Sequence, residues 1–271
     1  MEVIICRNEY EAAELVADAI EDLLTRKPTA VLGLATGTTP ALTYDELERR
    51  CAKGRLSFSR ASAFMLDEYL GLHENHAERY SNVIKTLLTA KVDIPDGSVH
   101  SPDSMTRDVI GECAAYERKI REAGGVDLQL LGIGTTGHIG FNEPTSSLAS
   151  RTRIKTLTDQ SRQDNSLFFT NWWRSSEPDP QAVPLHVITQ GIGTILDARH
   201  VILMANGKTK ASAIAAMVEG PLTSMVPASA LQMHPHATVV VDEEAAGELR
   251  YAPYFRTIHD FKPIEFQEPI A

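Results

Sequence analysis

Apolar residues recur along the chain at two spacings, and each spacing predicts a different element. Residues 8–27 place apolar side chains three and four positions apart, behind Asn8 as an N-cap and Glu11 three residues later, which predicts an amphipathic helix. The same periodicity predicts helices over residues 105–123 and 208–219. Apolar runs that are too short for helices predict buried strands, and they lie at residues 30–35, 63–66, 126–133, 201–205 and 238–241.

Buried strands that alternate with amphipathic helices predict an α/β fold, in which a mostly parallel sheet is covered by helices on both faces. No linker, repeat or low-complexity stretch divides residues 1–271, so we expect a single domain. Residues 157–186 break the alternation with a polar and aromatic stretch that includes Trp172 and Trp173. So long a connection is typical of a lid or binding loop, and a surface excursion whose aromatic side chains only pack is the alternative.

Charge and composition narrow the classes of partner. The chain carries 26 basic and 36 acidic side chains, a net charge of -10, which is unfavourable for binding nucleic acid or an anionic membrane. No apolar run reaches the roughly 18 residues that span a bilayer, and the acidic start is unlike a signal peptide, so we expect a cytoplasmic protein. The same charge repels phosphorylated metabolites, so such a ligand would need local N–H groups and a placed cation.

Ligands of parallel sheets bind at the carboxyl ends of the strands, and four such ends carry informative residues. The first predicted strand is followed by a turn of small and hydroxylic residues, Thr36, Gly37, Thr38 and Thr39. Thr39 is a cap residue type and Pro40 suits a first helical turn, so free N–H groups at a helix start would face the crevice. This turn is a candidate anion cradle, although the lysine of a P-loop is missing.

The second strand end carries two acidic residues, Asp67 and Glu68. A carboxyl group that is half-shielded by apolar neighbours is harder to ionise and can act as a general base near neutral pH. The alternative is that Asp67 caps a turn or a helix and that Glu68 is solvated.

The third strand end is a glycine-rich run over residues 132–144. It contains a Gly-x-Gly-x-x-Gly pattern, but Gly140 and Pro144 interrupt the long helix that a dinucleotide fingerprint requires. Without that helix, the run is a loop that presents His138 and Glu143 close together. An imidazole paired with a carboxylate can shuttle protons to a sugar ring oxygen near neutral pH.

The fourth strand end carries Lys208 and Lys210 at the start of a predicted helix. A lysine is unfavourable there for the helix dipole, which favours a role with an anion for one of the two, whereas the other is a solvated surface lysine.

Histidines with short spacings also occur in two pairs, His73 with His76 and His234 with His236. Neither pair has further ligands nearby, and the three cysteines are scattered, so we expect no metal site.

Taken together, the strand ends resemble the glucosamine-6-phosphate deaminase family, also called glucosamine-6-phosphate isomerase. The resemblance covers essentially the whole chain, and the motifs occur in the family's order and spacing. They are LATGTTP at residues 34–40, LDEY at 66–69, GHIGFNEP at 137–144, SSLASRTRIKTLT at 146–158 and LQMHP at 231–235. The resemblance implies a Rossmann-like three-layer sandwich, no metal or organic cofactor, and conversion of an amino-sugar phosphate to a ketose phosphate with release of ammonia.

The resemblance also implies a role for each matching residue. Asp67 would take the proton from C2 of glucosamine 6-phosphate and return it to C1 through an enolamine, which leads to fructose 6-phosphate. His138, with Glu143, would open the pyranose ring. The turn from Thr36 to Thr39 would hold the phosphate together with Lys210.

Some members of the family bind N-acetylglucosamine 6-phosphate at an allosteric site between subunits, and such members are hexamers. The matching residues here are Ser146, Arg153, Lys155, Thr156 and Tyr254. The resemblance therefore implies a homo-oligomer, with a hexamer and the allosteric effector as hypotheses. The expected ligand is otherwise a small amino-sugar phosphate, with no nucleic acid and no membrane as partners.

This chain departs from the family at two positions. The position two before the catalytic histidine is usually Asp or Asn, and Thr136 offers only a neutral hydroxyl to orient the imidazole, so ring opening is slower or depends more on Glu143. The arginine that usually grips the phosphate falls at Leu167, and losing a charge-assisted hydrogen bond of roughly 1.5–3 kcal/mol weakens binding about ten- to a hundred-fold. Arg162 and Arg174 are the candidates to replace it.

Two other functions stay open at the level of the sequence. A galactosamine-6-phosphate or related sugar-phosphate isomerase would fit Thr136 and the altered lid. A noncatalytic sugar-phosphate sensor would keep the pocket without turnover, although it has no need to retain Asp67, His138 and Glu143 together. A sugar-phosphate lactonase shares the implied fold, but the GHIGFNEP and LDEY motifs favour a deaminase.

Overall fold

The structure, a computed structural model, describes residues 1–169 and 178–262, and its strands form two sheets within those ranges. The large sheet is parallel, in the order β1-β10-β9-β6-β2-β3-β5. Its strands are β1 Glu2–Cys6, β2 Val31–Leu34, β3 Ser62–Met65, β5 Val99–His100, β6 Leu128–Leu131, β9 His200–Ala205 and β10 Ala237–Asp242. The small sheet is antiparallel and consists of β4 Asp67–Tyr69, β8 His186–Thr189 and β7 Arg153–Thr156.

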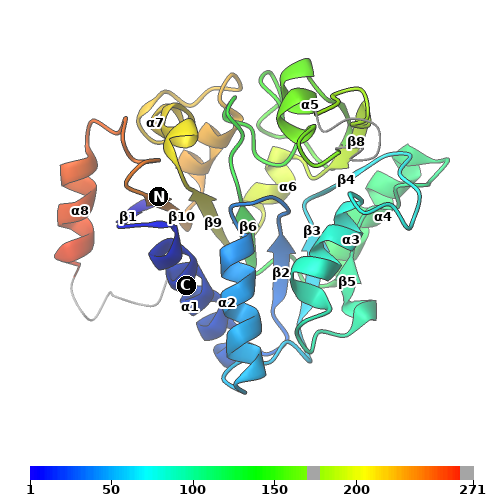
Figure 1. Cartoon of the computed structure of the whole chain (residues 1–271), viewed down its shortest axis with the longest axis horizontal. Coiled ribbons are helices and arrows are strands. Elements are labelled where there is room, and N and C mark those ends of the chain that lie inside the picture. The colour runs from blue at the N-terminus through cyan, green and yellow to red at the C-terminus, as the bar shows by residue number, and fades with distance from the viewer. Residues whose placement is uncertain (170–177, 263–271) are drawn as a thin grey trace.

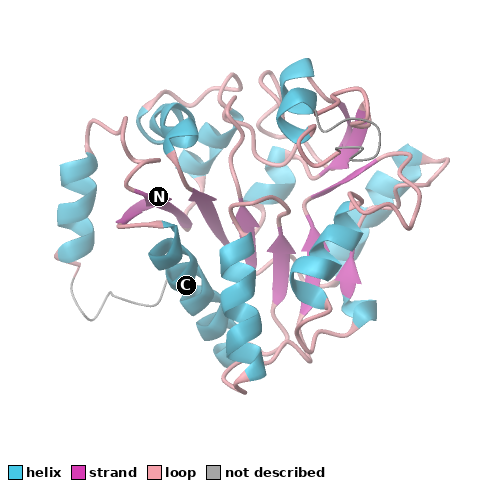
Figure 2. Ribbon diagram, in the orientation of Figure 1, coloured by secondary structure: helices cyan, strands magenta, loops and turns pink. Residues whose placement is uncertain are grey.

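Helices cover both faces of the large sheet, so the predicted three-layer α/β sandwich is confirmed (Figures 1 and 2). One face is covered by α1 Glu9–Arg26, α2 Ala41–Ala52, α3 Tyr80–Ile84 and the π-helical turn η1 Lys85–Thr89. The other face is covered by α4 Val109–Glu122, α6 Ile192–Leu196, α7 Ala211–Glu219 and the 3₁₀ segment η4 Pro227–Met233. The remaining helical segments are η2 Asp96–Ser98, α5 Asp159–Asn165, η3 Lys208–Lys210 and α8 Ala252–Asp260. None of the described helices is long and apolar enough to cross a bilayer.

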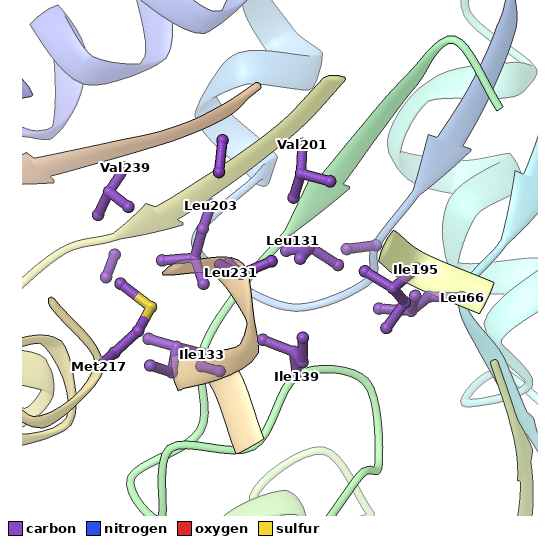
Figure 3. Packing of buried hydrophobic residues seen from close by; sticks show 14 of the residues in the cluster. Leu66, Leu131, Ile133, Ile139, Ile195, Val201, Leu203, Met217, Leu231 and Val239 are labelled. Atoms are coloured by element: carbon purple, nitrogen blue, oxygen red, sulfur yellow. The ribbon is translucent and has the colours of Figure 1, made fainter. Parts of the chain in front are cut away.

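The core beneath α6, α7 and η4 also holds the loops that follow the strands (Figure 3). Strand side chains such as Leu131 and Leu203 lie there in one apolar cluster with Met217 of α7. Ile133 and Ile139, which belong to the glycine-rich run, lie in the same apolar cluster and are buried. Burying such side chains contributes about 1.5–3 kcal/mol each, so the loop is anchored at both ends of its glycine-rich part.

The strongest sequence patterns gave the most accurate elements. All the predicted strands are present, with bounds shifted or shortened by a few residues, and Asn8 caps α1 by accepting hydrogen bonds from the N–H groups of Tyr10 and Glu11. The helix predicted over 105–123 begins only at Val109, behind Asp108 as its cap. The segment over 208–219 starts as the 3₁₀ turn η3 and continues as α7.

One prediction about the site region was wrong. We expected Asp67 to close a buried strand, but β3 ends at Met65 and Asp67 begins β4 in the small sheet. Leu66 links the two sheets, since its N–H donates to Leu34 and its carbonyl oxygen accepts from Gln190. Asp67 therefore lies where the chain passes from one sheet to the other, beside the carboxyl ends of β2 and β3.

Candidate active site

The turn after β2 presents backbone and hydroxyl groups to solvent. Gly37 adopts φ +123°, a backbone conformation that favours glycine. The N-cap of α2 is Pro40, which has no side chain to cap the helix, so the expectation that Thr39 caps α2 was wrong. The Ala41 N–H donates to the Thr38 carbonyl oxygen at 3.3 Å, and because the next N–H groups of a helix start have no intrahelical partners, they can donate to an anion. The Tyr44 hydroxyl donates to the Ala35 carbonyl oxygen at 2.7 Å and holds the turn against α2.

Asp67 is a buried carboxyl group that faces a cavity. Its side chain is only 5% exposed, and it lies on the wall of a cavity of about 340 Å³. Burial, and secondly the charge of Glu68, raise the pKa of Asp67 to about 8. A carboxyl group with such a pKa is ready to exchange a proton near neutral pH.

Glu68 has a different role from its neighbour. It is fully buried, and its carboxylate accepts hydrogen bonds from the backbone N–H groups of Tyr69, Tyr80 and Ser81 at 2.9–3.0 Å. Burial raises the pKa of Glu68, and these hydrogen bonds oppose that shift. Glu68 thus ties β4 to the start of α3, and the idea that it is solvated was wrong.

The glycine-rich run folds as a loop, and residues 132–152 contain no helix. A side chain at Gly134 would clash with the His138 ring, because a Cβ there would lie 2.1 Å from it. Gly140 adopts φ +53°, and a Cβ there would lie 2.9 Å from the Thr189 hydroxyl oxygen. The glycines therefore let the His138 imidazole fold over the loop and let the loop pack closely against Thr189 at the end of β8.

His138, Thr136 and Glu143 form a connected group. The Thr136 hydroxyl lies 2.9 Å from Nδ1 of His138 and donates to Oε2 of Glu143 at 3.4 Å, and His138 Nδ1 is 3.4 Å from the same oxygen. Thr136 thus bridges the imidazole and the carboxylate. Burial opposes ionisation of Glu143, but hydrogen bonds from His138, Ser161 and Thr136 outweigh it, so the pKa of this carboxyl lies below its usual value.

The cavity brings most of the predicted site residues together. Its walls include the turn from Thr36 to Thr39, Asp67, His138 and Lys210, whereas Thr136 and Glu143 lie behind His138. Among the residues that the structure describes, Lys210 is the only lysine or arginine on these walls. Burial lowers the pKa of Lys210, and the carboxylate of Asp164 opposes this shift. The alternative lysine, Lys208, is exposed, so Lys210 is the one placed for an anion.

Residues from α5 and the segment after it form the opposite wall, and the sequence did not single them out. They are Asp164, Asn165, Leu167 and Phe168. Tyr80 of α3 was also missed; it lines the cavity, and its hydroxyl donates to that of Tyr69 at 3.1 Å. The Thr-x-x-Ser pattern of residues 158–161 could have indicated the start of α5, where Thr158 is the N-cap. It could not have indicated that this helix lies beside the glycine-rich loop.

The predicted lid, residues 157–186, contains α5 but also residues 170–177, which the structure does not describe. Trp172, Trp173 and Arg174 therefore lie outside the described residues. Leu167 is 65% exposed on the cavity wall, so an apolar side chain stands where the family's arginine is expected. Arg162 donates to the Val183 carbonyl oxygen at 3.3 Å and is not among the residues that line the cavity.

The residues that match an allosteric site are only partly brought together. Arg153 and Lys155 lie on β7, and Arg153 donates to the Asn142 side chain at 2.9 Å. Ser146 is buried, and its hydroxyl has no hydrogen-bond partner in the described part of the chain. Thr156 is exposed on β7, whereas Tyr254 is exposed on α8, which packs against β1 on the far side of the molecule from β8 (Figure 1).

The histidine pairs have structural partners. His234 is buried, with Nε2 2.8 Å from the Ala198 carbonyl oxygen, and its Nδ1 accepts from the His236 N–H. His76 accepts from the Glu78 N–H. No group of ligands that could hold a metal ion occurs among residues 1–169 and 178–262.

With this geometry established, comparison with known proteins places the chain among its relatives. The family of glucosamine-6-phosphate isomerases and 6-phosphogluconolactonases matches residues 9–241. The chain belongs to this family. A glucosamine-6-phosphate deaminase of Arthrobacter sp. (strain FB24) is 57% identical over 263 residues, which is 97% of this chain and 98% of the relative. A glucosamine-6-phosphate deaminase of Mycolicibacterium smegmatis is 54% identical over the same shares.

Solved structures of family members have the same fold. A monomeric glucosamine-6-phosphate deaminase superimposes with a TM-score of 0.86 at 38% identity, covering 92% of this chain and 100% of the other. A 6-phosphogluconolactonase from Trypanosoma cruzi superimposes with a TM-score of 0.71 at 21% identity, covering 92% and 97%. The second likeness is evidence for the fold alone. The resemblance drawn from the motifs is confirmed at the level of the family.

Proposed function

We propose that this chain is a glucosamine-6-phosphate deaminase, which converts glucosamine 6-phosphate and water to fructose 6-phosphate and ammonia. The observation that carries the proposal is the position of Asp67, a buried carboxyl with a pKa of about 8 on the wall of the cavity that His138 and the Thr36 turn also line. The names of the deaminases that are 57% and 54% identical support it.

In the proposed reaction Asp67 moves a proton between two neighbouring carbons. Its carboxylate takes the proton from C2 of the open-chain sugar while O1 takes up a proton that the C2 ammonium group releases, which leaves a neutral enolamine across C1 and C2. The resulting carboxylic acid returns its proton to C1 and gives the protonated C2 imine, which water hydrolyses to the ketone and ammonia in its protonated form. A base with a pKa near the working pH can both accept and return a proton, and this favours Asp67 over an ordinary exposed carboxylate.

The ring must open before the C2 proton becomes acidic. We assign this step to His138, whose imidazole lines the cavity and is backed by the Glu143 carboxylate. The Thr136 hydroxyl would orient the imidazole through Nδ1, in place of the carboxylate or amide usual in the family. A carboxylate behind an imidazole stabilises the charged form that appears during proton transfer.

The phosphate would lie at the turn from Thr36 to Thr39, beside Lys210. The N–H groups at the start of α2 and one ammonium group would together provide the positive field that a chain of net charge -10 otherwise lacks. No metal or organic cofactor is part of this proposal. We also propose a cytoplasmic homo-oligomer, with Ser146, Arg153, Lys155, Thr156 and Tyr254 as the hypothetical effector site.

Purified protein incubated with glucosamine 6-phosphate should release ammonia and fructose 6-phosphate in equal amounts. Faster turnover of galactosamine 6-phosphate would favour the epimeric isomerase, and hydrolysis of 6-phosphogluconolactone would favour a lactonase. Thermal stabilisation by glucosamine 6-phosphate without turnover would favour a sensor. Folded protein that turns over none of these compounds would contradict the proposal.

A further inference from the structure

A buried serine on α5 contacts the carboxylate behind the catalytic histidine. Ser161 is fully buried, and its hydroxyl donates to Oε1 of Glu143. The other oxygen, Oε2, is the one that lies near Thr136 and His138. The two oxygens of the Glu143 carboxylate therefore contact different partners. Oε2 lies near Thr136 and His138 in the glycine-rich loop, whereas Oε1 contacts Ser161 on α5.

The direction of the Ser161 hydroxyl is itself fixed. Thr158, the N-cap of α5, accepts from the Ser161 N–H at 3.1 Å and donates its own hydroxyl to Ser161 Oγ at 3.2 Å. An oxygen that already accepts one hydrogen bond is left to donate its proton, and the remaining partner is Glu143. The hydroxyls thus run in series from Thr158 through Ser161 to the carboxylate.

The other groups around Glu143 do not replace this contact. Two charged groups interact with it: His138, through Nδ1, and Lys155, whose pKa burial lowers while the Glu143 carboxylate opposes that shift. Thr136 is shared between His138 and Glu143. Ser161 alone among these partners is a neutral donor with no contact to the imidazole, so it can hold the carboxylate without competing for the proton that moves.

We propose that Ser161 is a positioning residue for ring opening, whose hydroxyl fixes one oxygen of Glu143 so that the other faces Thr136 and His138. This inference rests on the proposed deaminase function. Ser161 also connects Glu143 to the cavity wall, because its helix, α5, supplies Asp164 and Asn165 to that wall. Asp164 in turn accepts a hydrogen bond from the Thr135 hydroxyl at 3.1 Å. The two hydrogen bonds join α5 to the glycine-rich loop on either side of His138.

The test compares Ser161→Ala with the wild type, and the wild type comes first. If the wild type turns over glucosamine 6-phosphate, Ser161→Ala should lower kcat roughly ten-fold with little change in KM, which is the size expected for a lost hydrogen bond to a charged group. Alanine suits a helix, and the N–H contact of residue 161 to Thr158 does not need the side chain, so the fold should persist. Ser161→Thr restores the hydroxyl and should recover most of the rate.

Ser166→Ala is the matched control. Ser166 is a fully buried serine at the end of α5, and its hydroxyl donates to the Gln163 carbonyl oxygen rather than to Glu143. It should leave kcat within about two-fold of the wild type. Equal losses in the two variants would overturn the inference, because they would mean that any buried hydroxyl in this helix matters alike.

A second readout does not depend on catalysis. The Glu143 carboxyl can be titrated by carbon-13 NMR in the protein without substrate, with Glu143→Gln to assign its signal. Removing a donor to the charged form should raise its pKa in Ser161→Ala, whereas Ser166→Ala should not move it. An unchanged titration in Ser161→Ala, or an unchanged kcat, would overturn the positioning role. A wild type without turnover would overturn the proposed function instead.

Discussion

The two walls of the cavity differ in how they are built and in what they offer a substrate. One wall comes from the strand ends of the large sheet and brings the Thr36 turn, His138 and Lys210, with Asp67 at the passage between the sheets. The other comes from α5 and the residues after it, and brings an acid, an amide and the exposed side chains of Leu167 and Phe168. The first wall carries the groups that we propose bind the phosphate and move protons, and the second shapes the space opposite them.

This difference follows from the elements beneath each wall. The loops of the first wall are held by buried residues such as Ile133 and Ile139 in the core of the large sheet. The second wall is built on the seven-residue helix α5, whose links to the glycine-rich loop include the hydrogen bonds of Ser161 and Asp164. We therefore expect substitutions in the first wall to affect chemistry and anchoring, and those in the second wall to tune affinity and alignment.

The largest effect is expected at Asp67. Asp67→Asn keeps the volume but removes the base, and kcat should fall about a thousand-fold, within the range of general base catalysis. Asp164→Asn is the matched carboxylate on the opposite wall and should leave kcat near the wild-type value. Steady-state kinetics of both variants check this, and a comparable loss in Asp164→Asn would contradict the division between the walls.

The next effect concerns the phosphate. Lys210→Ala should raise KM about ten- to a hundred-fold with a smaller change in kcat, because one charge-assisted hydrogen bond is lost. Lys208→Ala is the control, since Lys208 is exposed and is not among the residues that line the cavity. An unchanged KM in Lys210→Ala would mean that another group anchors the anionic end.

Asp67 should also make the stability of the protein depend on pH. Its folded pKa of about 8 lies above the unfolded value near 3.9, so the folded state binds the proton more tightly, and stability falls as pH rises from about 4 to about 8. Asp67→Asn lacks this penalty and should raise the free energy of unfolding at pH 9 by on the order of 5 kcal/mol relative to the wild type. Urea unfolding at pH 5 and 9 measures the difference, which should shrink to about 1.5 kcal/mol at pH 5. A difference that does not grow with pH would contradict the raised pKa.

The smallest effect is a gain on the second wall. Leu167→Arg places a cation on the cavity wall at the position where the sequence resemblance implies one, and KM should fall several-fold, by up to about ten-fold, with kcat little changed. Leu167→Gln is the control for polarity without charge. A KM that rises in Leu167→Arg would show that the segment around Leu167 has moved away from the phosphate.

The same difference between the walls explains what the sequence could predict. Thr36, Asp67, His138 and Lys210 follow strong apolar runs, and a parallel sheet brings the carboxyl ends of its strands to one edge, so a local pattern was enough to place them together. Short strands such as β4 and β7 lack a periodic signal in the sequence. The small sheet, and the position of Asp67 as the first residue of β4, were therefore not predicted.

The second wall depends on contacts between segments distant in sequence. A serine three residues after Thr158 has the pattern of an ordinary helix start, and nothing in that pattern shows that its hydroxyl meets Glu143. Thr39 failed as a cap for a similar reason: Thr39 and Pro40 both suit the start of a helix, and the structure makes Pro40 the boundary. Local sequence preference predicts which residue types begin a helix, but not at which residue the helix begins.

The central claim is that Asp67 is the base and that its buried position sets the pH at which it works. The pH dependence of kcat/KM for glucosamine 6-phosphate tests this most directly, because that ratio reports groups of the free enzyme. The account predicts that kcat/KM falls as pH is lowered through about 8, where the Asp67 carboxylate takes up its proton. A kcat/KM that stays level down to about pH 5 would contradict it, since an exposed, ordinary carboxylate behaves in that way.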